Sequence, residues 1–251
     1  MVLDRVGAYA LRLGDDCLVL AQRLSEWSSN APELEEDVAL TNIALDLLGQ
    51  ARTLLTYAGD REGRGRDEDD LAFLREEREF VNCQLVEQPN GDFAHTIARQ
   101  LLVSTFQLAQ WQALSDSRDA TLAAVAAKAA KEAAYHRDHA EQWTVRLGDG
   151  TAESHTRMQA GLEAMWPYSG ELFESDALVR DLAESGIAVD PAAWRPGWDA
   201  FVGGVLTEAT LTLPQSAWSP GGGRRGLHTE AFGYLVAEMQ HLHRAHPGAR
   251  W

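Results

Sequence analysis

The sequence has little cysteine and little basic charge. Only two of its 251 residues are cysteines, Cys17 and Cys83, too few for a disulfide framework or a metal site with four cysteine ligands. Lysine and arginine number 22 against 38 aspartates and glutamates, which gives a formal net charge of −16. Because nucleic-acid phosphates are bound by basic patches, we expect no nucleic-acid surface. We expect both cysteines to be reduced packing residues.

Long apolar runs are also lacking. No stretch approaches the length that crosses a bilayer, and residues 1–16 lack the basic segment, apolar run and cleavage site of a signal peptide. The alternation of apolar and polar residues that is typical of β-strands is weak throughout. We therefore expect a cytoplasmic protein with no membrane contact, and the 45% hydrophobic content is sufficient for a sizeable core.

Apolar residues recur at helical spacing along most of the chain. One unbroken row runs from Leu3 to Trp27, and further long helices are expected over residues 34–58, 93–114 and 120–148. The helix over 34–58 has two apolar faces and is expected to be enclosed on most sides. One of its faces carries Leu34, Val38, Leu45 and Leu48, and the other carries Leu40, Ile43, Leu47 and Leu54. Residues 59–70, rich in charge and glycine, are expected to form a loop.

The predicted fold class is all-α: a bundle of four antiparallel helices in two hairpins, with additional C-terminal helices. We expect a single domain over residues 1–251, in which residues 1–148 form the core bundle and residues 149–251 form a helical extension packed on it. The extension is expected to contain helices near 151–172, 176–186, 192–213 and 229–245, with tryptophans that could anchor an interface or belong to the core. The glycine-rich segment SPGGGRRG is expected to be a flexible basic loop, in which Arg224 and Arg225 could meet an anion.

Bundles of this kind can hold two iron ions, with a Glu from each of two helices and a Glu-x-x-His from each of the other two. His136 lies on the core row of its helix, but the position three residues before it is Ala133. The second helix has Asp46 followed by Gly49, and the first helix has Gln22 near the matching level. We therefore expect a vestigial metal site near Gln22, Asp46, Gly49, Ala133 and His136, with no metal bound and no catalytic residue in this chain.

One intact Glu-x-x-His occurs, at Glu238 and His241 on the last predicted helix. The apolar positions of that helix place both side chains away from its buried face. A single match in an acidic chain with 8 histidines is weak support for a metal site, so we interpret the pair as solvated surface.

Several long blocks resemble the C-subunit family of phenylacetyl-CoA epoxidases (ring 1,2-phenylacetyl-CoA monooxygenases). They are YALRLGDDCLVLAQRLSEW, APELEEDVALTNIALDLLGQAR, LVEQPNGDFAHTIARQ, KEAAYH, ESGIAVDP and GLHTEAFGYLVAEMQ, and they extend over almost the whole chain. The resemblance implies a ferritin-like fold and a part in aerobic phenylacetate catabolism. It also implies a hetero-oligomer in which a related catalytic A subunit holds the di-iron centre and inserts one oxygen atom into the ring.

The resemblance further implies a non-catalytic structural subunit of this monooxygenase complex, one that binds no cofactor itself. NADPH, flavin and an iron–sulfur centre would belong to a reductase subunit, and other epoxidase subunits are further possible partners. In the family, a polar segment lies near the CoA ester of an aromatic acyl-CoA at the subunit interface. Carried over to this chain, it makes Glu79, Phe80, Val81 and Asn82 substrate-contacting candidates, although the segment could equally be a structural linker.

Two alternatives remain open. The chain could be a di-iron carboxylate oxygenase with an atypical ligand set that uses Asp46, His136 and Gln22, and metal content would distinguish this hypothesis from the structural one. It could also be an independent helical binding module, which a lack of association with the catalytic A subunit would favour.

Overall fold

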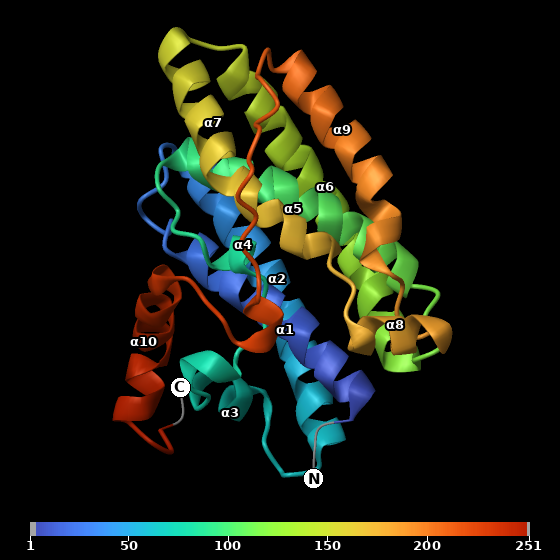
Figure 1. Cartoon of the computed structure of the whole chain (residues 1–251). Coiled ribbons are helices and arrows are strands. Elements are labelled where there is room, and N and C mark those ends of the chain that lie inside the picture. Colours follow the sequence, from blue (N-terminus) through green and yellow to red (C-terminus); the bar gives the residue numbers. More distant parts are fainter. Residues whose placement is uncertain (1–3, 250–251) are drawn as a thin grey trace. The chain divides into compact units, whose positions relative to one another are not determined.

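The computed structural model describes residues 4–249, and within this range the chain is all-α, as predicted (Figure 1). Helices account for 74% of the structure. The chain divides into two compact units. The first comprises residues 1–89 and 222–251, and the second comprises residues 90–221.

An antiparallel hairpin of α1 (Arg5–Ser25) and α2 (Leu34–Glu62) forms the centre of the first unit. Helix α1 begins where the Asp4 carboxylate accepts a hydrogen bond from the Gly7 amide at 2.7 Å, which satisfies one free N–H of the first turn. The helices approach closely at Gly14, because a Cβ atom there would lie 2.9 Å from Leu55 Cδ2. The Cys17 thiol donates to Gln50 Oε1 of α2 at 3.4 Å. Both cysteines are buried and reduced, as predicted.

Three short helices that follow α2 and two helices near the C-terminus complete the first unit. They are α3 (Glu68–Phe73), the 3₁₀ helix η1 (Glu77–Glu79), α4 (Gln84–Glu87), the 3₁₀ helix η4 (Gly223–Arg225) and α10 (Glu230–Ala245). Helix α10 packs against α1, α3, η1 and α4. The last helix of the chain therefore belongs to the same unit as the first two.

A second antiparallel hairpin, α5 (Phe93–Leu114) and α6 (Ala120–Gly148), organises the second unit. Phe93 and Trp143 meet edge to face across this hairpin, with ring centroids 5.0 Å apart. The other elements are α7 (Ala152–Met165), the 3₁₀ helix η2 (Trp166–Phe173), α8 (Ala177–Glu184), the 3₁₀ helix η3 (Pro191–Trp194) and α9 (Arg195–Glu208). Trp198 of α9 is buried and donates its indole N–H to the Leu102 carbonyl of α5 at 3.0 Å.

The structure corrects several helix limits. Helix α2 continues to Glu62 and α3 begins at Glu68, so much of the loop expected over 59–70 is helical. The helix expected over 151–172 ends at Met165, where the 3₁₀ helix η2 follows it. The helix expected over 192–213 ends at Glu208. Helix α6 ends at Gly148, as predicted. Leu3, the start of the first apolar row, lies outside the described residues. The division of the chain into a core bundle over residues 1–148 and a helical extension over residues 149–251 stays a prediction.

The expected enclosure of α2 is wrong. Leu40, Ile43, Leu47 and Leu54 are buried, but the other apolar face is open to solvent: Leu34 is 76% exposed, Val38 52%, Leu45 59% and Leu48 47%. Helical spacing alone does not tell whether an apolar face is covered by the same chain. None of the helices between residues 4 and 249 combines the length and the apolar character that a bilayer crossing requires.

The Trp198 contact gives a test of the second unit. Trp198→Phe keeps an aromatic ring but removes the N–H that binds the Leu102 carbonyl. We expect the free energy of unfolding to fall by at least about 1 kcal/mol, because the hydrogen bond is lost and the smaller ring leaves space in a buried site. Urea denaturation followed by circular dichroism measures it. Trp218→Phe, at a 59% exposed tryptophan, is the control and should change stability by less than about 0.5 kcal/mol. Equal effects of the two substitutions would contradict the role assigned to the Trp198 side chain in the second unit.

Candidate functional site

The four predicted substrate-contacting residues lie in a segment that is held by buried polar contacts. We call residues 75–88 the clasped segment. It connects α3 to the end of α4 and includes η1 and the extended residues that follow it. Two other parts of the first unit hold it: α1, and the residues from Gly222 to the start of α10.

Two adjacent buried aspartates of α1 hold the first half of the clasped segment. The Asp15 carboxylate accepts hydrogen bonds from both Nη atoms of Arg75, with an Nη1–Oδ2 distance of 3.0 Å, and from the Val81 amide at 2.9 Å. Asp16 accepts from the Cys83 amide at 2.8 Å. Consecutive positions of a helix differ by about 100° in direction, so the two carboxylates reach different parts of the segment.

The contact between Asp15 and Arg75 is a buried ion pair. Its side chain is 2% exposed and that of Asp15 is 0% exposed. Arg75 also donates to the Glu79 carbonyl at 3.0 Å, and its guanidinium carbon lies 4.0 Å from the centroid of the Phe80 ring. Removing one partner of such a pair leaves an uncompensated buried charge, at a cost of about 3–5 kcal/mol. The contacts of Arg75 therefore fix the backbone from residue 75 to residue 80.

The segment after Gly222 holds the clasped segment from another direction. Arg224 donates to both oxygens of Asp16, at 3.0 and 2.7 Å, and to the Val81 carbonyl at 3.0 Å. Backbones approach so closely here that a Cβ at Gly223 would lie 2.1 Å from the Asn82 carbonyl oxygen, and one at Gly226 would lie 2.2 Å from that of Arg78. We expected this glycine-rich segment to be a flexible loop, and that expectation is wrong. The anion that Arg224 meets is Asp16.

A second buried ion pair, between Glu87 and His228, holds the other end of the clasped segment. Glu87 Oε2 lies 2.7 Å from His228 Nδ1 and accepts from Asn82 Nδ2 at 2.9 Å, while Glu87 Oε1 accepts from the Thr229 amide at 2.6 Å. His228 Nε2 lies 3.0 Å from the Phe80 carbonyl oxygen. Both ring nitrogens therefore face acceptors, an arrangement that suits the doubly protonated, charged imidazolium.

The environment of His228 favours its charged form. Burial opposes the charge and lowers the pKa, but the hydrogen bond and the negative charge of Glu87, with the Phe80 carbonyl, outweigh it and raise the pKa of His228 above its ordinary value. The stabilisation from the pair is therefore complete below the unfolded-state pKa of about 6.5, and it is lost as the pH rises through the higher folded-state pKa.

The contacts that hold the clasped segment determine which of the four predicted substrate-contacting residues expose their side chains to solvent. Phe80 and Asn82 are 0% exposed, and Phe80 packs edge to face on Phe232 of α10. Glu79 is exposed and accepts from the Glu76 amide at 2.8 Å, and Val81 is half-buried. That these four residues contact an acyl-CoA stays a prediction. The segment also serves as a structural connection, because its buried side chains pack within the first unit.

The residues expected to form a vestigial metal site lie in different units. Gln22 and Asp46 are half-buried in the first unit, and Ala133 and His136 are buried in the second. Gly49 is exposed, and a Cβ there would meet no atom within 4 Å, so the expectation that position 49 points inward is wrong. Alanine and glycine side chains carry no donor atoms, so positions 133 and 49 do not fit a di-iron centre. The grouping of the five residues stays a prediction.

Two further observations concern metal ligands. Within residues 4–249, no group of three or more His, Cys, Asp or Glu side chains is arranged to hold a metal ion. Glu238 and His241 of the isolated Glu-x-x-His are both exposed, which confirms their interpretation as solvated surface.

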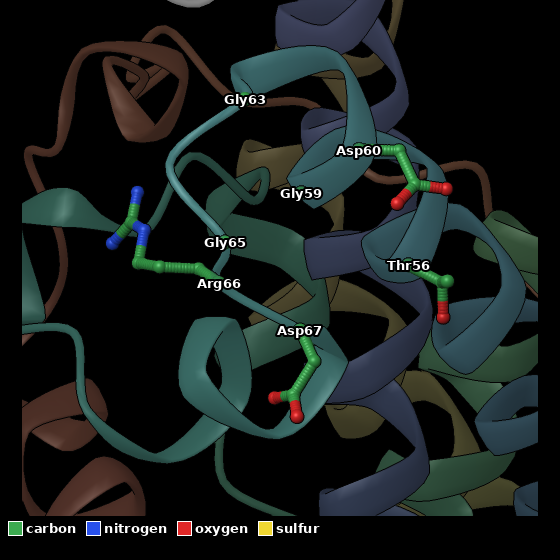
Figure 2. A pocket seen from close by; sticks show the side chains of 7 residues that line it. All are labelled: Thr56, Gly59, Asp60, Gly63, Gly65, Arg66 and Asp67. Atoms are coloured by element: carbon green, nitrogen blue, oxygen red, sulfur yellow. The ribbon is translucent and has the colours of Figure 1, made fainter.

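Two hollows lie on the first unit. One, of about 400 Å³, lies at the C-terminal end of α2 and is lined by Thr56, Gly59, Asp60, Gly63, Gly65, Arg66 and Asp67. Figure 2 shows the Arg66 side chain directed to the opposite side from Thr56 and Asp60, and it pairs with Glu62 at 2.6 Å. Asp67 caps α3 and Thr56 binds Glu68, so these polar groups serve local structure. The other hollow, of about 340 Å³, lies between α2 and α3 and is mostly apolar.

The close approach at Gly226 predicts a large effect of a single methyl group. Gly226 has a φ of 72° and lies against the Arg78 carbonyl, so Gly226→Ala combines an unfavourable backbone conformation with a steric clash. We expect the free energy of unfolding to fall by at least about 2 kcal/mol. The control is Gly49→Ala, at an open helical position, which should raise it by about 0.5–1 kcal/mol. Chemical denaturation of both variants measures the difference, and similar values for the two would show that the clasp is not rigid.

The His228–Glu87 pair predicts a pH-dependent stability. His228→Gln should lower the free energy of unfolding by about 3–5 kcal/mol near pH 6, where the wild-type pair is charged. The wild type should lose stability as the pH rises above about 6.5, and the variant should lack this component. Denaturant titrations from pH 6 to pH 9 measure both effects. His241→Gln, at an exposed histidine of α10, is the control and should keep the wild-type profile, whereas a His228→Gln profile parallel to wild type would exclude this pair as the titrating group.

Comparison with known proteins agrees with the resemblance inferred from the sequence. A family model described as "Phenylacetic acid catabolic protein" matches residues 3–251. The chain is also 52% identical over 249 residues to the C subunit of 1,2-phenylacetyl-CoA epoxidase from Escherichia coli (strain K12), an alignment that covers 99% of this chain and 100% of the relative. Two long helical hairpins are what a ferritin-like fold requires. The chain belongs to the phenylacetic acid catabolic protein family and is similar over almost its whole length to the C subunit of the epoxidase.

Proposed function

We propose that this chain is a non-catalytic structural subunit of a phenylacetyl-CoA 1,2-epoxidase in phenylacetate catabolism. In this proposal it pairs with the di-iron A subunit and supports it, and it holds no iron of its own. The iron belongs to the A subunit, and NADPH, flavin and an iron–sulfur centre belong to a reductase subunit. The similarity to the C subunit of an epoxidase supports the membership in such a complex.

The observation that carries the non-catalytic role is the use of three buried carboxylates of the first unit. Asp15 binds Arg75, Asp16 binds Arg224 and Glu87 binds His228, and each of them also accepts a hydrogen bond from a backbone amide. A carboxylate ligand in a di-iron bundle must direct a free oxygen to the metal. These three carboxylates instead hold the clasped segment, so their chemistry is that of a scaffold.

A scaffold role has a physical basis in the clasped segment. Its backbone is fixed by buried charge, while the side chains of Glu76, Glu77, Arg78 and Glu79 remain exposed. A rigid support positions a partner's active-site groups more precisely than a mobile one, because small displacements of reacting groups reduce the rate strongly. We propose that this exposed part faces the A subunit near the bound aromatic acyl-CoA, with Glu79 and the half-buried Val81 that follows it as the substrate-side residues.

Iron content tests the proposal. The purified chain, the A subunit and their mixture are loaded anaerobically with ferrous iron, separated by gel filtration and analysed for metal. We expect the chain and the A subunit to elute together, with iron in proportion to the A subunit and only a small fraction of an equivalent in the lone chain. About two irons per lone chain, as a di-iron bundle binds, would make it an oxygenase instead. Separate elution from the A subunit would favour an independent binding module.

A further inference from the structure

Four large apolar side chains lie along one solvent-exposed face of α2. We call Leu34, Val38, Leu45 and Leu48 the α2 seam. With Thr41 and Arg52 the positions step by four and three residues in turn, which is the spacing that a second helix meets when it lies alongside at a small angle. Four large side chains between 47% and 76% exposed on one helix face are unusual for a surface that stays in water.

The α2 seam leads into the apolar hollow between α2 and α3. Leu48 belongs to both, and Leu18, Ala51, Leu55, Ala72 and Phe73 also line the hollow. Its volume of about 340 Å³ is enough to receive a large side chain from a partner. A ridge that ends in a pocket is typical of interfaces in which an apolar anchor fills a cavity.

The charges beside the α2 seam indicate what kind of partner fits. Glu33 and Glu35 are exposed at its N-terminal end, with Asp37 beside them. Arg52, at the other end, pairs with Glu68 at 3.0 Å, so a negative charge lies beside its positive charge. A second copy would bring a further formal charge of −16 to the contact, which like-charge repulsion opposes. A helix flanked by lysine or arginine would complement this surface.

We infer that the α2 seam is the docking surface for an amphipathic helix of the di-iron subunit, flanked by basic residues and with one large apolar side chain that enters the hollow. This inference rests on the proposed function, because it names the surface by which the proposed pairing takes place. Burial of the seam supplies affinity, and the acidic end supplies orientation and rate of association.

The test compares binding of the purified di-iron subunit to wild-type chain and to two surface variants by calorimetry and stopped flow. Leu45→Glu with Leu48→Glu should weaken the Kd at least about tenfold, since it places charge in the apolar centre of the contact. Glu33→Lys with Glu35→Lys should slow association and reduce its dependence on salt. The matched control is Leu242→Glu, at a 52% exposed leucine of α10, which should bind as wild type. Circular dichroism checks that all variants keep their fold, as expected for exposed positions.

Three outcomes would overturn the inference, and they differ in what they leave standing. If the wild type and the Leu45→Glu, Leu48→Glu variant bind equally well, the seam is not the docking surface but the proposed function stands. If the lone wild type sediments as a dimer and this variant as a monomer, a second copy occupies the seam. If the wild type does not bind the di-iron subunit at all, the proposed function fails and this inference fails with it.

Discussion

The pairing of Asp15 and Asp16 with Arg75 and Arg224 is the constraint on which the first unit depends. A buried carboxylate is tolerated only when a cation and hydrogen-bond donors surround it, because desolvation otherwise costs several kcal/mol. Each of these aspartates has both. The α1 helix therefore fits its surroundings only when residues 75–83 and Arg224 are in place. Local helix formation is thereby coupled to contacts between distant parts of the sequence.

The separation in sequence between interacting residues decides which parts of the structure could be predicted. Helices α1, α2, α5 and α6 follow from apolar spacing, because helical periodicity depends on residues three and four apart. The clasp was not predicted, since Asp15 and Arg75 are 60 residues apart and Asp16 and Arg224 are 208 apart. The available signal was a pair of adjacent aspartates within an apolar helical row, which indicates buried charge but does not name its partners.

The predicted site illustrates the same limit. Resemblance directed attention to Glu79, Phe80, Val81 and Asn82, and these residues do lie where the polar contacts of the first unit converge. Spacing could not tell that the Phe80 and Asn82 side chains are buried, because η1 and the extended residues after it have no periodic pattern. For α2 the pattern was clear but ambiguous, since an apolar face is the same in sequence whether its own chain or a partner covers it. Gly49 was expected to point inward because it follows Asp46 at the spacing of a Glu-x-x-His, and that spacing does not tell which face of α2 is covered.

The two features of the first unit rest on different physics and are therefore separable. The clasped segment gains its geometry from buried charges and has few apolar groups to offer a partner, so it fixes shape more than it supplies affinity. The α2 seam offers apolar area without buried polar contacts, so in the proposed pairing its contribution is to affinity more than to orientation. A subunit that positions another enzyme's active site needs both properties. Because none of the four seam residues makes a buried polar contact that holds the clasped segment, substitutions in the seam are expected to change the strength of association without changing the geometry of the segment.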